Sequence, residues 1–172
     1  MFKVGAYIVY GLNGVCKVEK VEPMESSSVS SERLYYTLVP VYVSGSRIIT
    51  PVDNKKVKMR PIITKSEVME LINDMNECEP LWIQDDRARE EIYKNAIKEN
   101  NSFDLIRMIK ALYLRRKARL AEGKKATASD EKYFKLAEEC LYGEFAIALD
   151  MEKKDVVDYI SQFLSEKTDI EE

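Results

Sequence analysis

The feature that most constrains the fold of this chain is a change in the spacing of its apolar residues near the Arg60-Pro61 dipeptide. Before this point apolar residues recur at every second position, as in GVCKVEK (14–20), where Cys16 and Val18 share one side and charged residues the other. Such alternation is typical of a half-buried strand. After this point the spacing is three to four residues, the period of an amphipathic helix. The sequence therefore predicts a β domain followed by an α domain.

Short segments rich in β-branched and aromatic residues predict four or five strands in the β domain, residues 1–62. They are AYIVY (6–10), GVCKVEK (14–20), RLYYTLVPVY (33–42), SRIIT (46–50) and a short strand near Lys58. A tight turn joins the first two strands, because Gly11 and Gly14 tolerate positive φ. So many short antiparallel strands indicate a small, partly open barrel of the SH3 or Tudor type.

The α domain, residues 63–165, is predicted to be a bundle of about five helices, with an acidic tail at 166–172. Thr64 and Glu67 have the spacing of a capping box at the start of the first helix. Further helices are expected at about 84–99, at 102–121, from Thr127 or Ser129 to about 148, and at 154–164. The expected fold class is thus α+β, with two domains.

Several residue types needed for catalysis are missing or scattered. The chain has no histidine, which is the commonest general base and metal ligand in proteins. Its six glycines form neither a phosphate loop nor a dinucleotide motif. Cys16, Cys78 and Cys140 lack the spacing of metal ligands. We therefore predict a protein that is not an enzyme and holds no cofactor or metal. Because its apolar runs are short, we also expect a cytoplasmic protein without a membrane partner.

Charge is distributed unevenly along the chain. The net charge is −3, but residues 1–65 hold 10 basic and 5 acidic side chains, a sum of +5, so the remainder sums to −8. Within that remainder, residues 107–125 hold eight basic residues and one acidic residue, a sum of +7. One interpretation is a solvated helix end whose cations favour the helix dipole. Solvated surfaces usually mix the two signs, however, so we favour a phosphate-bearing partner.

Among phosphate-bearing partners, the basic segment favours nucleic acid over a membrane surface. A surface helix needs an apolar face to lie in lipid, and the Leu and Ile residues of this segment are expected in the core. The only tryptophan, Trp82, lies ahead of Arg87 and Arg89. It has two interpretations: an anchor in the core, or an apolar wedge flanked by cations that enters a DNA minor groove.

Several short motifs occur in a characteristic order over about residues 1–150. They are Met1-Phe2-Lys3-Val4-Gly5, Val9-Tyr10, Gly14-Val15, Pro51-Val52-Asp53-Asn54, Arg60-Pro61, the basic run Leu112 to Arg119, and Glu131, Leu136-Ala137, Leu141, Glu144 and Ala146. In this order they resemble the CarD/CdnL family of bacterial transcription regulators. Transcription-repair coupling factors carry a similar barrel, but this chain has no helicase motifs.

The resemblance implies a regulator with two binding domains. The Tudor-like domain of the family binds the RNA polymerase β subunit through an exposed strand edge. The helical domain contacts promoter DNA at the upstream edge of the transcription bubble and stabilises the open complex with little sequence specificity. A monomer located at the nucleoid through RNA polymerase is expected.

Carried onto this sequence, the resemblance assigns three sets of residues. The polymerase-binding set is Arg47, Ile48, Ile49, Thr50 and Pro51, and the DNA wedge is Trp82. The phosphate contacts are Arg87, Arg89, Arg115, Arg116, Lys117 and Arg119. Two positions depart from the family pattern: Arg47 is offset from the family's basic contact, and Trp82 falls about one helical turn ahead of the family's tryptophan.

Two other functions fit the same features. The chain is alternatively an adaptor, in which the barrel binds a peptide and the basic helix binds an acidic patch of a protein. It is also compatible with a factor that associates with RNA or the ribosome. DNA binding, tested against competing duplex RNA, separates these possibilities.

Overall fold

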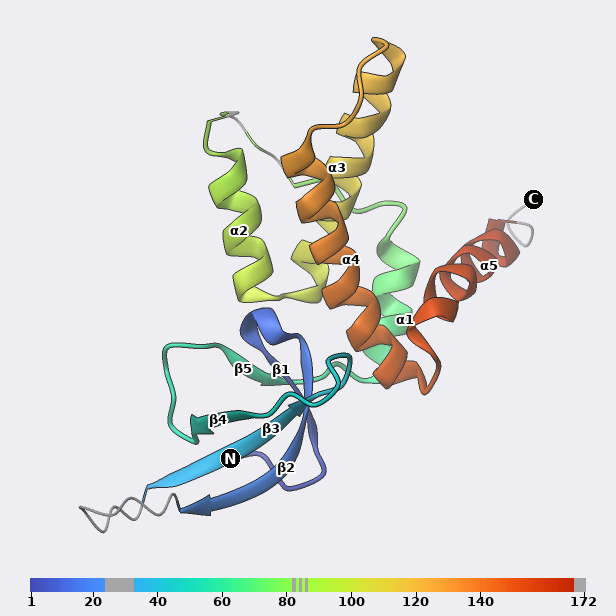
Figure 1. Cartoon of the computed structure of the whole chain (residues 1–172). Helices are drawn as coiled ribbons and strands as arrows, with labels where there is room; N and C mark the ends of the chain where they lie inside the picture. The colour runs from blue at the N-terminus through green and yellow to red at the C-terminus, as the bar shows by residue number, and fades with distance from the viewer. Residues whose placement is uncertain (24–32, 82, 84, 86, 169–172) are drawn as a thin grey trace. The chain divides into compact units, whose positions relative to one another are not determined.

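The computed structural model describes residues 1–23, 33–81, 83, 85 and 87–168. The chain forms two compact units, Met1–Ile62 and Ile63–Glu172. A five-stranded antiparallel sheet makes up the first, and five α-helices make up the second (Figure 1). The predicted α+β fold class is therefore confirmed. None of the helices in the described residues combines the length and apolarity that a membrane crossing needs.

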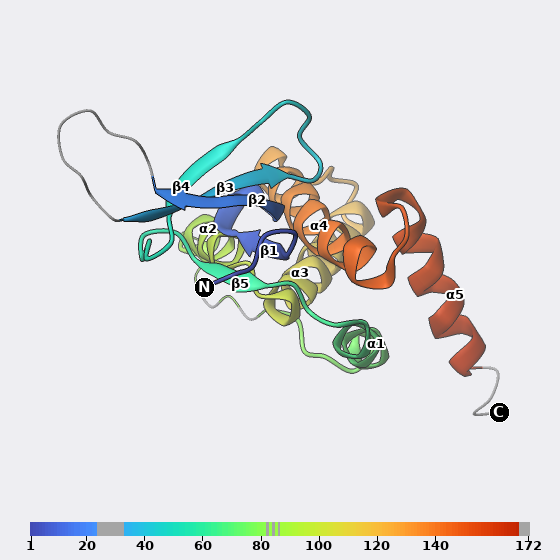
Figure 2. The ribbon, with the colours of Figure 1, turned by 90° about the horizontal axis from the view of Figure 1, so that it is seen from below.

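The strands of the N-terminal unit are β1 (Tyr7–Tyr10), β2 (Val15–Pro23), β3 (Leu34–Pro40), β4 (Ile48–Pro51) and β5 (Met59–Pro61). Their order in the sheet is β4-β3-β2-β1-β5, and each neighbouring pair is antiparallel. Figure 2 shows β4, β3 and β2 lying side by side. The two border strands of the sheet are therefore β4 and β5.

Alternate residues of the strands form the core of this unit. The fully or nearly buried members are Ile8, Tyr10, Cys16, Val18, Tyr36 and Leu38. The pairing of β2 with β3 shifts register between Val18 and Lys20, so Glu19 occupies a β-bulge. A bulge redirects a side chain relative to a regular strand. The bulge therefore takes Glu19 out of the regular alternation of side chains along β2.

The helices of the second unit are α1 (Lys65–Asp74), α2 (Arg89–Glu99), α3 (Ser102–Ala121), α4 (Ala128–Leu149) and α5 (Val156–Thr168). The capping box predicted for α1 is confirmed: Thr64 Oγ1 accepts from Glu67 N at 3.2 Å, and the Glu67 carboxylate accepts from Thr64 N at 2.7 Å. At α4, Thr127 is the N-cap and accepts from the backbone N–H of Asp130.

Two predicted helix boundaries are wrong. The second helix begins at Arg89 rather than near residue 84, because the Asp85 carboxylate accepts from Arg87 N at 2.9 Å and the Asp85 carbonyl accepts from Ala88 N at 3.1 Å. These bonds form a turn ahead of the helix. The last helix begins at Val156, after a 3-10 turn over Lys153–Asp155, and continues to Thr168.

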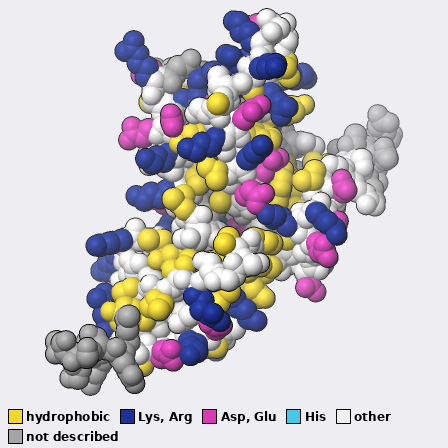
Figure 3. Space-filling view, in the orientation of Figure 1, with side chains coloured by type: hydrophobic (Ala, Val, Ile, Leu, Met, Phe, Trp, Pro, Cys, Tyr) yellow, Lys and Arg dark blue, Asp and Glu magenta, His cyan; other side chains and the backbone are white. Residues whose placement is uncertain are grey.

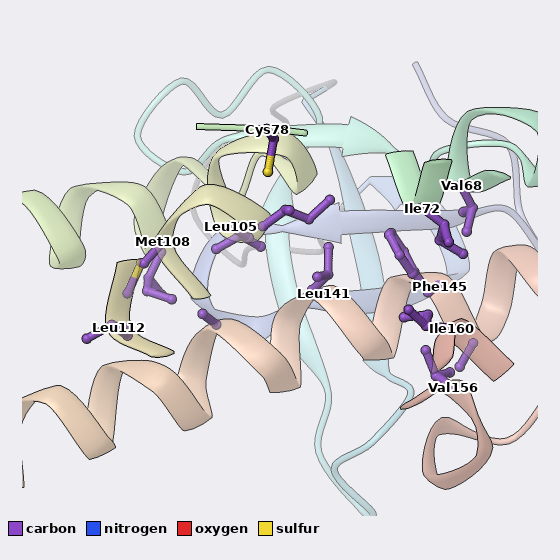
Figure 4. Close-up of a cluster of buried hydrophobic side chains, with 14 of the residues drawn as sticks. Val68, Ile72, Cys78, Leu105, Met108, Leu112, Leu141, Phe145, Val156 and Ile160 are labelled. Carbon is purple, nitrogen blue, oxygen red and sulfur yellow. The ribbon is translucent and has the colours of Figure 1, made fainter. Parts of the chain in front are cut away.

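The core of the helical unit is built around α4. Leu141 and Phe145 of α4 lie between side chains from α1, α3 and α5, including Ile72, Leu105 and Ile160 (Figure 4). Each helix presents apolar side chains to this centre, as the 3.6-residue period predicts. Leu136 and Val157, which were expected on the buried stripes, are exposed.

A buried carboxylate fixes where two helices begin. Glu144 of α4 is fully buried, and its two oxygens accept hydrogen bonds from Ile63 N at 3.0 Å and from Ser102 Oγ at 2.8 Å. Ile63 immediately precedes the cap of α1, and Ser102 is the first residue of α3. Burying a polar group costs free energy unless it is hydrogen-bonded. Glu144 therefore ties the starts of α1 and α3 to α4.

Candidate functional site

The outer edge of β4 presents backbone hydrogen-bonding groups. Val52 N donates to Leu34 O at 3.0 Å, and the register of β3 with β4 pairs Thr50 with Tyr36. In an antiparallel ladder the peptide groups of alternate residues point to opposite sides. Those of Thr50 therefore point toward β3, and the N–H and C=O of Ile49 point away from the sheet.

Four of the five residues assigned to polymerase binding form β4, and their side chains alternate between its two faces. Ile49 is 59% exposed, whereas Thr50 is 2% exposed. The Thr50 hydroxyl accepts from Tyr10 OH at 3.1 Å and from Asn54 Nδ2 at 2.8 Å, and Ile48 packs against the core. Ile48 and Thr50 thus hold the strand in place, and Ile49 is its outward-facing apolar side chain.

Arg47 lies just before β4 and is held by Glu19 from the bulge in β2. Arg47 Nε donates to Glu19 Oε2 at 2.9 Å, and Arg47 Nη2 donates to Oε1 at 3.1 Å. This fork lowers the pKa of the Glu19 carboxyl below its ordinary value. Arg47 is exposed and Glu19 is half-buried, and a pair at the surface adds little stability. The effect of the pair is to orient a guanidinium beside the outer edge of β4.

The basic end of α3 extends past the core of the helical unit. The buried residues of α3 end at Leu112, although the helix continues for nine residues to Ala121. Arg116 and Lys117 lie on this extension and are exposed. In Figure 3, dark-blue Lys and Arg side chains gather around this end of the surface. The extension therefore presents cations to solvent at a distance from the core.

Two arginines of the same segment bind within the chain. Arg115 Nε contacts Asp130 Oδ2 at 2.7 Å, and Asp130 has a side chain only 9% exposed. Arg119 Nε donates to Lys125 O at 2.8 Å. Both contacts connect the end of α3 with the chain that leads into α4. Arg115 and Arg119 therefore shape the connection, while Arg116 and Lys117 face outward.

Lys110, another of the eight basic residues in this region, also has an internal role. Its Nζ donates to the carbonyls of Asn76 at 2.8 Å and Cys78 at 2.6 Å, beyond the end of α1. Helix ends leave carbonyls without partners in the helix, and a cation satisfies them. Some of the cations counted along the sequence thus bind groups within the helical unit itself.

Apolar side chains accompany the exposed cations. Leu114 is 46% exposed and Leu120 is 57% exposed, and Tyr113 is exposed as well. The prediction that the leucines of this segment lie in the core is therefore wrong at two positions. The physical reason is that α3 continues beyond the helices that cover its first half. The end of α3 therefore has exposed apolar side chains, and their expected absence no longer counts against a membrane surface.

The remaining predicted DNA contacts lie near the start of α2. Arg87 is exposed, and Arg89 is half-buried as the first residue of the helix. Trp82, the predicted wedge, lies outside the described residues. The structure therefore places the two arginines at and just before the start of α2.

The cysteines show no pairing and no metal-ligand cluster. All three are free thiols, and in the described part of the chain no group of three or more Cys, Asp or Glu side chains is arranged to hold a metal ion. Burial raises the pKa of Cys16 and of Cys140 to about 11. Thiols of this kind are poor nucleophiles at neutral pH, because the thiolate is the reactive form.

Comparison with known protein families identifies the N-terminal unit. Residues 2–63 match the family described as CarD-like/TRCF RID domain, in which RID denotes the RNA polymerase-interacting domain. The match spans β1 to β5 and ends where the helical unit begins. The resemblance found in the sequence is therefore confirmed over this part. No curated protein matches the chain.

Proposed function

We propose that this chain is a transcription regulator that binds the RNA polymerase β subunit and promoter DNA and stabilises the open complex. The match of residues 2–63 to an RNA polymerase-interacting domain is the observation that carries the proposal. The matched unit has a border strand, β4, with outward-pointing peptide groups at Ile49. The proposed regulator is monomeric and is not an enzyme.

Docking on the polymerase proceeds by strand addition. An extended segment of the β subunit pairs with the N–H and C=O of Ile49, in the manner by which exposed sheet edges recruit peptides. The Ile49 side chain supplies apolar contact at the centre of the docked strand. Arg47, oriented by Glu19, lies at the polar rim, where a charge affects the association rate more than the affinity.

The helical unit then holds DNA where the strands separate. Arg116 and Lys117 contact backbone phosphates, with Arg87 and Arg89 as further contacts, and Trp82 is the wedge. Phosphate contacts position a protein without reading the sequence, which accounts for low specificity. Because the wedge binds unstacked DNA better than paired duplex, it shifts the melting equilibrium by that difference in binding free energy.

The test of this proposal is the lifetime of promoter open complexes formed by purified polymerase. Competitor-challenged complexes are expected to decay more slowly when the full chain is present. An unchanged lifetime, in a sample where the chain is shown to be bound to polymerase, would mean that the DNA part of the proposal is wrong and that only the polymerase part stands.

One observation favours a second candidate function, that of a protein–protein adaptor. The exposed Tyr113, Leu114 and Leu120 give the end of α3 an apolar component, which protein interfaces use more than DNA backbones do. An adaptor binds an acidic protein surface there and does not bind DNA. A factor that associates with RNA would instead bind duplex RNA in preference to duplex DNA.

A further inference from the structure

We infer that the turn at residues 54–58, within the connection 52–58 that joins β4 to β5, is a second DNA-binding surface that contacts backbone phosphates through Lys55 and Lys56. This inference goes beyond the proposed function, which assigns DNA contacts to the helical unit alone. It rests on the charge of the N-terminal unit and on the way the turn is anchored.

Positive charge in the N-terminal unit is concentrated in this turn. Residues 1–62 hold nine Lys or Arg and five Asp or Glu, a sum of +4. The three carboxylates that the structure describes in this unit each form an ion pair: Glu19 with Arg47 at 2.9 Å, Glu22 with Lys20 at 3.6 Å, and Asp53 with Arg33 at 2.9 Å. The pKa of Asp53 is lowered mainly by Arg33 and, to a smaller extent, by Lys55. Of the other six cations, Lys55, Lys56 and Lys58 lie within four residues, and all three are exposed.

Asn54 anchors the first half of the turn from inside. Its Nδ2 donates to Thr50 Oγ1 at 2.8 Å, and its Oδ1 accepts from Lys56 N at 2.8 Å. Its own N–H donates to Pro51 O at 3.1 Å. The backbone that carries Lys55 and Lys56 is therefore tied to β4 through the buried hydroxyl of Thr50.

Val57 and Gly11 anchor the second half. Val57 packs against the core of the sheet, and a Cβ at Gly11 would lie 2.7 Å from Val57 Cγ1. Gly11 has φ +46° and donates its N–H to Lys58 O at 3.0 Å. Asn54 and Val57 thus point inward while the lysines point outward. A fixed backbone lowers the entropy lost when a ligand binds.

The composition of the turn fits a phosphate backbone better than a protein surface. Protein interfaces are depleted in lysine and enriched in aromatic residues, and the single apolar side chain of the turn, Val57, is directed into the core. Clustered lysines without interleaved carboxylates neutralise phosphates and release counterions. The turn begins three residues after the end of β4, so a unit docked through Ile49 would present these lysines to nearby DNA.

The test measures binding of the full chain to a labelled DNA duplex of arbitrary sequence, by fluorescence anisotropy between about 50 and 200 mM salt. Each phosphate contact contributes about 0.9 to the slope of log affinity against log salt. For the double variant Lys55→Gln/Lys56→Gln, the slope is expected to fall by about 1.8. The fold of this variant is checked by its urea unfolding curve, since its anchors at Asn54 and Val57 are unchanged.

Two matched double variants remove the same charge from other places. Lys3→Gln/Lys17→Gln removes two exposed lysines from the same unit and is expected to change the slope by less than half as much. Arg116→Gln/Lys117→Gln removes two cations from α3 and tests the proposed function instead.

The outcomes separate the two proposals. A wild-type slope for Lys55→Gln/Lys56→Gln overturns the inference, as does a loss no larger than that of Lys3→Gln/Lys17→Gln. The inference is also overturned if Lys55→Gln/Lys56→Gln keeps the wild-type salt slope but no longer captures purified polymerase, because the turn then contacts protein and not DNA. If the slope falls for the turn variant but not for Arg116→Gln/Lys117→Gln, the inference stands and the role of α3 fails. If the wild-type chain binds no duplex, both DNA assignments fail.

Discussion

Arg115 and Asp130 join the basic end of α3 to the first turn of α4 through an Nε–Oδ2 contact of 2.7 Å. The next residue, Arg116, is exposed. Two adjacent arginines of one helix thus have different surroundings: one binds a nearly buried carboxylate and the other faces solvent. This difference makes them a matched pair for separating stability from DNA binding.

Arg115→Gln is expected to lower the free energy of unfolding by roughly 1–3 kcal/mol, because Asp130 loses its charged partner while staying buried. Arg116→Gln is expected to change it by no more than about 0.5 kcal/mol. Urea denaturation measures both. DNA binding is expected to give the opposite order, with Arg116→Gln lowering the salt slope by about one. Equal stability of the two variants would contradict the role given to Arg115.

Ile49→Pro is expected to abolish capture of the purified β subunit while leaving the sheet intact. Proline lacks a backbone N–H, and the N–H of Ile49 points away from β3, so no ladder bond is lost. The control Ile49→Ala keeps the N–H and should retain most of the binding. Capture by Ile49→Pro at wild-type strength would show that the polymerase does not pair with this edge.

Trp82→Ala is expected to shorten the lifetime of the open complex without weakening polymerase binding. A wedge stabilises unstacked DNA, so its loss affects the melted state and not the docking step. The measurement is competitor-challenged decay of complexes saturated with the variant. Trp82→Phe retains an aromatic ring and serves as the matched control. A wild-type lifetime for Trp82→Ala would leave the residue with the other interpretation, an anchor in the core.

Arg47→Gln is expected to return the pKa of Glu19 toward its ordinary carboxyl value. The bond from Arg47 lowers that pKa in the folded chain, so the pair stabilises the fold above the unfolded pKa, and this contribution is lost as pH falls through the folded pKa. Carboxyl carbon shifts followed against pH by NMR measure the change. Asp53, whose pKa is lowered by Arg33, is the internal control and should titrate as before. A Glu19 titration that does not change would disprove the pairing.

Cys16 and Cys140 are expected to resist alkylation in the native chain at neutral pH. Burial raises the pKa of both thiols to about 11, so little thiolate is present. Peptide mapping after iodoacetamide treatment, with and without urea, measures the protection. Modification of either cysteine at the rate found in urea would show that its surroundings open readily.

Local patterns predicted the elements of the fold because they depend on neighbours in sequence. The alternation of Cys16 and Val18 indicated a strand with one buried face, and the Thr64–Glu67 spacing indicated the cap of α1; both are present. The same alternation also applies to β4. Ile49 is exposed, so its neighbours Ile48 and Thr50 face the core. The predicted polymerase-binding set consisted of consecutive residues and did not separate the two faces of the strand.

Features that depend on tertiary contacts were not accessible in this way. A count of charges does not show that Arg115 binds Asp130, fifteen residues further along the chain. Helical periodicity shows which residues share a stripe but not where the covering helix ends, so Leu114 and Leu120 were assigned to the core although they are exposed. Glu19 as the partner of Arg47 depends on a bulge, for which the sequence carries no clear signal.

The carboxylate of Glu144 has a consequence for how the helical unit opens. It accepts from the amide of Ile63, which stands 81 residues earlier in the chain, and from the hydroxyl of Ser102. Both bonds require α4 to be in place. Fraying of α1 alone therefore does not release the Ile63 amide from the Glu144 carboxylate. The Ile63 amide should exchange with deuterium only when the whole helical unit unfolds. Its exchange rate therefore measures how cooperatively the first residue of that unit unfolds with the rest.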